Sequence, residues 1–266
     1  MSGFGVVHTE FAEPPQFPLD LPEHRLPAGV QELRDALASG GGVRNMADIL
    51  EARFGIDVVR VREIGTAYSV YVGARAVIVL RETANWFHEN WSMAHEVGHL
   101  VAGRASVNAS KGTAEAQANA FAAEVLLPEP SVQRLAHVTT AEALGDLIWV
   151  WGVSTEAVRR RSDALRIELP KLVRDWLQDT TVSFLRKAFP ASRWPEIAMR
   201  QRDAATRRFP ATLTLAHERA IEEGRLGKGT LAWMLGVDED AVEVAQPTIH
   251  EVDAEELVSM LGLAPA

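Results

Sequence analysis

The pattern of apolar and polar positions predicts a small β-sheet in the first third of the chain. Residues 56–64 alternate and are rich in valine, which is typical of a half-buried strand. Residues 69–72 and 75–80 are two further short apolar runs, and the intervening Gly73-Ala74 favours a hairpin. We expect 76–80 to be the edge strand, where an extended peptide could form backbone hydrogen bonds along a cleft.

Helical periodicity dominates the rest of the chain, which predicts an α+β protein with a mainly helical second half. Residues 1–27 contain five prolines and little periodicity, so we expect an extended or disordered N-terminal arm there. Apolar positions at helical spacing occur in the segments 30–37, 43–54, 91–102, 113–127, 172–185, 197–209, 213–223 and 254–261.

One predicted helix carries two histidines at a metal-binding spacing. His95 and His99 lie four residues apart, so a helix places both imidazoles on one face about one turn apart. Glu96 lies to the side, where its carboxylate can act as a general base on a water at the metal, an arrangement typical of zinc peptidases. An amphipathic helix with two half-buried histidines fits the five residues too, but the apolar context favours the metal. Gly98 would let another element approach closely.

The next helix offers a third ligand. Residues 113–127 are rich in alanine and end before Pro128, and Glu115 and Asn119 share one face. Glu115 is the predicted ligand, and Asn119 could then orient a ligating side chain through a hydrogen bond. Glu124 is the rival, but it lies about 180° around the helix from Glu115, so only one of them can face the metal. A solvated carboxylate in the first helical turn is the plainer alternative for Glu115.

These motifs resemble the ImmA/IrrE family of metallopeptidases. The resemblance rests on His95-Glu-Val-Gly-His99, Glu115-Ala-Gln-Ala-Asn119-Ala-Phe-Ala and Leu126-Leu-Pro128, and it covers roughly residues 30–165. It implies that the two histidines and Glu115 bind Zn²⁺ and that Glu96 is the catalytic base. Two departures stand out: Glu89-Asn-Trp-Ser92 replaces an arginine-phenylalanine-threonine run that is common in the family, and no recognisable helix-turn-helix precedes the peptidase part.

The resemblance also implies a fold and a substrate. We expect a zincin-like catalytic domain of the gluzincin type at 28–166. It would follow the arm at 1–27 and precede a helical C-terminal domain at 167–266. The expected activity is a regulatory cleavage in a protein, such as a helix-turn-helix transcriptional repressor, in transcription regulation or a stress response. Oligomeric state is not predicted.

Composition narrows the class of protein. The formal net charge of −9 argues against a protein whose main task is to wrap nucleic acid. The absence of cysteine excludes disulfides and thiolate ligands and fits a cytoplasmic protein. The apolar run 147–153 is far too short for a membrane span, and Met1–His8 lacks the features of a secretory signal.

Two segments with similar sequences, 145–158 and 229–242, predict a helix, a Gly-Val turn and a second helix, the shape of a helix-turn-helix. DNA binding is one interpretation and helix packing is the other, which we favour. The later segment is acidic, so the first, followed by Arg159-Arg160-Arg161, is the better DNA-binding candidate.

Hydrolysis would also need a donor to the oxyanion. Tyr68, Tyr71, His88 and His137 are candidates, and no spacing distinguishes them. The sequence therefore predicts a zinc metallopeptidase. The alternative is a zinc-bearing regulatory protein, or a DNA-binding regulator, that acts through a partner without efficient hydrolysis.

Overall fold

The computed structural model describes residues 25–72, 75–103 and 111–244. The chain divides into two compact units, Met1–Pro210 and Ala211–Ala266. Most of the predicted N-terminal arm, the turn at 73–74 and the predicted helix at 254–261 lie outside the described residues.

A three-stranded sheet is the only sheet in the described part of the chain. Its strands are β1 (Asp57–Val61), β2 (Tyr68–Val72) and β3 (Arg75–Arg81), in the order β1-β3-β2. β1 pairs with β3 in parallel, and β2 pairs with β3 antiparallel. The prediction that 76–80 forms the edge strand is therefore wrong. β3 is the central strand, and β1 and β2 are the two edges of the sheet.

The two faces of the sheet have different coverings. Val58, Ile78 and Leu80 are buried in the main core together with residues of the long helix α4 (Trp86–Gly103). The other face buries Val59 and Val79 in a small separate cluster. This alternation follows from the period of two in a strand, which sends successive side chains to opposite faces.

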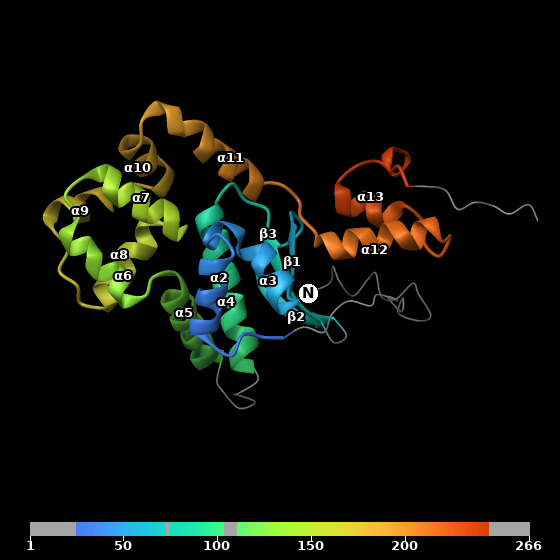
Figure 1. The fold of residues 1–266 in the computed structure, drawn as a ribbon, viewed down its shortest axis with the longest axis horizontal. Coiled ribbons are helices and arrows are strands. Elements are labelled where there is room, and N and C mark those ends of the chain that lie inside the picture. Colours follow the sequence, from blue (N-terminus) through green and yellow to red (C-terminus); the bar gives the residue numbers. More distant parts are fainter. Residues whose placement is uncertain (1–24, 73–74, 104–110, 245–266) are drawn as a thin grey trace, which may run out of the picture. The chain divides into compact units, whose positions relative to one another are not determined.

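Helices cover the core on the α4 side of the sheet (Figure 1). α4 is followed by α5 (Lys111–Leu126), which packs along it. Gly98 is the point of closest approach, because a Cβ there would lie 2.9 Å from Ala118 Cα and 3.1 Å from Phe121 Cβ. The glycine predicted to permit a close approach therefore does so between α4 and α5. The preceding elements are α2 (Val30–Ser39), η1 (Val43–Asn45) and α3 (Met46–Phe54).

A group of shorter helices completes the first unit. Leu144, Val173 and Leu185 belong to the same continuous core as the sheet and α4. The sequence predicts a boundary after residue 166, whereas the compact unit extends to Pro210, because these later helices share that core. The helices are α6 (Glu129–Gln133), η2 (Arg134–His137), α7 (Ala141–Trp151), α8 (Thr155–Ala164), α9 (Lys171–Trp176), α10 (Thr181–Ala188), η3 (Ala191–Arg193) and α11 (Trp194–Ala204).

The second unit contains α12 (Ala211–Glu222), α13 (Gly229–Leu235) and η4 (Glu239–Ala241). Its small core includes Ile221, Leu231 and Val242. The similar segments share a turn: α7 ends at Gly152 and α13 at Gly236, with φ of 60° and 69°. The left-handed region favours glycine, which explains the shared Gly-Val turns. A full second helix, α8, follows only the first turn in the described part of the chain. The sheet with its helices confirms the predicted α+β, zincin-like architecture.

Candidate metal centre

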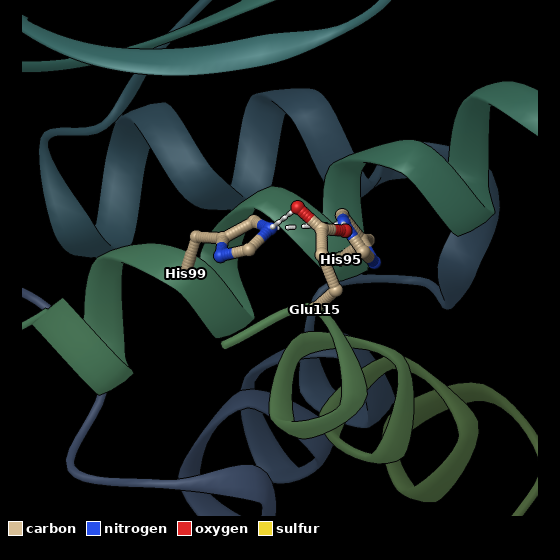
Figure 2. Close-up of side chains that lie close together, drawn as sticks. All are labelled: His95, His99 and Glu115. Carbon is tan, nitrogen blue, oxygen red and sulfur yellow. Dashed lines mark hydrogen bonds and ion pairs between the residues drawn. The ribbon is translucent and has the colours of Figure 1, made fainter. Parts of the chain in front are cut away.

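Helices α4 and α5 bring three potential metal ligands together. His95 and His99 project from adjacent turns of α4, with their Nε2 atoms 3.0 Å apart. Glu115, from the start of α5, places Oε2 3.3 Å from His95 Nε2 and Oε1 3.4 Å from His99 Nε2 (Figure 2). The three side chains are partly exposed, so an ion could reach them from solvent.

The spacing of these atoms fits a tetrahedral ion. Bonds of about 2.0–2.1 Å to zinc place neighbouring ligand atoms in a tetrahedron roughly 3.3 Å apart. The three observed separations, 3.0, 3.3 and 3.4 Å, lie close to that value. Two imidazole nitrogens and one carboxylate are also the donor types of a catalytic zinc site with a fourth position left for water. The cluster could therefore hold Zn²⁺.

Asn119 orients the first histidine. Its Oδ1 lies 3.2 Å from His95 Nδ1, so the ring can donate Nδ1–H to the amide oxygen. That tautomer leaves the lone pair of Nε2 directed at the cluster. Asn119 lies four residues after Glu115, so the helix that supplies the carboxylate also orients an imidazole.

Glu124, the rival ligand, has a different partner. Its carboxylate forms an ion pair with Arg161 of α8, and Arg161 Nε also donates to Leu127 O at 3.0 Å. Glu124 is therefore not part of the His95–His99–Glu115 cluster. The same contact holds Arg161 within the fold, and Arg160 forms an exposed ion pair with Glu156 along α8.

Glu96 lies beside the cluster and is 6% exposed. Ser69 of β2 donates its hydroxyl to Glu96 Oε2 at 2.8 Å. No sequence signal pointed to Ser69, because the two residues are 27 positions apart and the contact depends on how β2 lies against α4. A buried carboxylate next to a potential metal site can accept a proton from a water held there.

Two neighbouring cavities form a groove along β2. The larger, of about 640 Å³, contains the cluster and Glu96, and the smaller, of about 300 Å³, extends towards the end of α4. Ser69 and His99 line both, so the cluster lies where the cavities meet. The remaining residues of the larger cavity are Thr66, Ala67, Tyr68, Trp91, Ser92 and Asn119, and those of the smaller are Tyr71, Leu100 and Gly103.

The four candidates for an oxyanion donor lie in different surroundings, which distinguishes them. Tyr71 lines the smaller cavity next to His99. Tyr68 borders the larger cavity but packs against the small cluster on the far face of the sheet, and burial raises the pKa of its phenol. His88 is exposed, with Nδ1 3.0 Å from Ser92 Oγ, and His137 is an exposed residue of η2. Tyr71 is therefore the best placed of the four.

The unusual run before the first histidine has a role in packing. Glu89 forms a buried ion pair with Arg60 of β1, in which Arg60 Nε donates at 3.0 Å. Asn90 donates to Gly152 O at 2.9 Å, which ties α4 to the turn between α7 and α8. The segment 89–92 thus fastens α4 to the rest of the unit and supplies Trp91 and Ser92 to the groove.

Comparison with known proteins agrees with the site. Residues 51–163 match the family of peptidase M78, described as the IrrE N-terminal-like domain. This matched part, which contains β1 to β3, α4, α5 and the whole cluster, belongs to the ImmA/IrrE family, as the motifs predicted. The family indicates a metallopeptidase-type protein. No curated protein is significantly similar to the chain. No helix in the described residues is long and apolar enough to cross a membrane.

Proposed function

We propose that this protein is a zinc-dependent endopeptidase that makes regulatory cleavages in a protein partner. The observation that supports this most strongly is the convergence of His95, His99 and Glu115 at distances suited to zinc, next to the buried Glu96. A family of peptidases that matches this part of the chain adds to it.

The proposed roles follow from the contacts. Neutral His95 and His99, with Glu115, would hold Zn²⁺, and Asn119 would fix the tautomer of His95. When bound, zinc acidifies a water and polarises the peptide carbonyl. Glu96 would take the proton from the attacking water and pass it to the leaving amine. Tyr71, which lines the same cavity as His99, would donate to the oxyanion.

An extended segment of the partner would bind along β2. β2 is an edge strand that borders the groove, and its residues Val70, Tyr71 and Val72 are 39–48% exposed. The opposite edge of the sheet is partly closed, because Arg60 and Arg208 exchange backbone hydrogen bonds of 2.8 and 3.0 Å. A substrate strand added to β2 would therefore pass the cluster. A helix-turn-helix repressor, suggested by the family, would suit an acidic protein of net charge −9, since DNA-binding proteins are basic.

Metal analysis and cleavage test this proposal together. The full chain should purify with about one zinc per molecule and, when co-expressed with the product of a neighbouring gene, should produce a discrete fragment. Glu96→Gln should keep the zinc and lose the fragment, whereas Glu142→Gln, an exposed control on α7, should cleave normally. If Glu96→Gln retains the full biological effect, the protein is instead a regulatory zinc protein that acts by binding.

A further inference from the structure

The proposed base receives a hydrogen bond from the strand that would bind substrate. Ser69 Oγ donates to Glu96 Oε2 at 2.8 Å. A glutamate has three side-chain torsions, so an unrestrained carboxylate would sample several directions. The hydroxyl holds Oε2 in place, which leaves the other carboxylate oxygen, Oε1, to accept a proton.

The hydroxyl is itself held by the sheet. Ser69 lies opposite Ile78 in the β2–β3 pairing, and Ile78 is fully buried beneath α4. Strand alternation sends Ser69 and Tyr71 to the groove, whereas Tyr68 packs on the other face. Ser69 is thus placed by backbone pairing, and it lines both cavities of the groove.

We propose that Ser69 is the positioning residue of the catalytic base, and that it links the substrate-binding strand to Glu96. This inference rests on the proposed function, because it takes Glu96 as the base. Ser69 acts through Glu96 and does not itself hold the metal. A peptide added to β2 would order the strand, the hydroxyl and the carboxylate as one unit, so that Glu96 is best oriented when substrate is present.

A matched pair of substitutions isolates the hydroxyl. Ser69→Thr and Ser69→Val have nearly the same shape and both suit a strand, but only threonine keeps the donor. Acetohydroxamate is the probe, since a hydroxamate chelates zinc and gives a proton to a neighbouring carboxylate. On the zinc-loaded full chain, Ser69→Val should bind acetohydroxamate about tenfold more weakly at unchanged zinc content, and Ser69→Thr should bind it within about twofold of the parent protein.

A double-substitution cycle shows whether the effect passes through Glu96. In a Glu96→Ala background, Ser69→Val should have no further effect on acetohydroxamate binding, because the carboxylate that the hydroxyl positions is absent. With the cleaved partner, Ser69→Val should lower kcat about tenfold and change KM less than twofold, since positioning affects the reacting state rather than binding. If the valine side chain prevents folding, as judged by melting and zinc content, Ser69→Ala replaces it in the same cycle.

Each outcome decides one proposal. Three results would each overturn the role of Ser69. Ser69→Val could bind acetohydroxamate as tightly as the parent protein does, or Ser69→Thr could lose as much affinity for it as Ser69→Val. In the third, Ser69→Val weakens acetohydroxamate binding just as much in the Glu96→Ala background. A protein that follows the expected probe binding but cleaves no partner would retain the role of Ser69 in orienting Glu96 and would refute the endopeptidase function instead.

Discussion

Helix α5 carries one glutamate on each of two opposite faces, and their partners differ completely. Glu115 and Glu124 have nearly equal side-chain exposure, 48% and 47%. Glu115 faces two imidazoles, whereas Glu124 pairs with the guanidinium of Arg161. Exposure alone therefore does not distinguish a candidate ligand from a structural carboxylate, and the chemistry of the partner does.

Helix α4 repeats the contrast. Its buried Glu89 meets Arg60, which is already charged, and the pair needs nothing further. Its groove residues His95 and His99 instead lie 3.3 and 3.4 Å from the carboxylate of Glu115 on α5. Such a set is best satisfied by a cation. The groove residues could therefore hold a metal ion, whereas Glu89 joins α4 to a strand far away in the chain.

The largest expected effect tests the buried ion pair that joins α4 to β1. Glu89→Gln removes the charge that compensates Arg60 in a buried place, so the free energy of unfolding should fall by about 3–5 kcal/mol. Urea denaturation measures it. The matched Glu124→Gln breaks a half-exposed pair and should lose only about 1 kcal/mol or less. Similar losses in the two variants would show that burial of the carboxylate does not determine what each ion pair contributes.

Zinc affinity compares the two glutamates of α5 directly. Glu115→Gln removes one of three ligands, and its affinity for zinc should fall by more than about 100-fold, beyond the loss typical of an outer hydrogen-bonding partner. Glu124→Gln should bind zinc as the parent protein does. Competition with a zinc-sensitive dye measures both, and a loss in Glu124→Gln comparable to that in Glu115→Gln would reverse the assignment of the two glutamates.

A smaller loss is expected where the groove face supports a ligand indirectly. Asn119→Ala removes the acceptor of His95 Nδ1 and frees the ring to adopt the other tautomer. Zinc affinity should fall by about tenfold. Gln117→Ala, an exposed neighbour on α5, is the control and should be without effect. An unchanged affinity in Asn119→Ala would mean that helix packing alone orients His95.

Local periodicity explains which of these features the sequence could predict. The i, i+4 spacing places His95 with His99 and Glu115 with Asn119, and the half-turn between Glu115 and Glu124 follows from the same geometry. The order of the strands, the contact of Ser69 with Glu96 and the inclusion of α9 to α11 in the first unit depend on contacts between distant residues. Neither edge of the sheet carries a local pattern that distinguishes it. That is why 76–80 was expected at the edge although β3 is central.

Gly98 lies where α4 and α5 approach each other closely. Its substitution gives the smallest predicted effect. Alanine favours a helix over glycine by about 1 kcal/mol, but its Cβ would lie 2.9 Å from Ala118 Cα and 3.1 Å from Ala118 O. Backbone cannot move aside as a flexible side chain can, so overpacking should cost about 2 kcal/mol and leave a net loss of about 1 kcal/mol. Thermal denaturation of Gly98→Ala measures it, and zinc competition should show weaker binding because α5 carries Glu115 away from the histidines.

Gly103→Ala, where a Cβ meets nothing within 4 Å, should lose neither stability nor zinc affinity. A Gly98→Ala protein that is more stable than its parent would mean that the two helices can separate without cost, and that the metal cluster does not depend on their close approach.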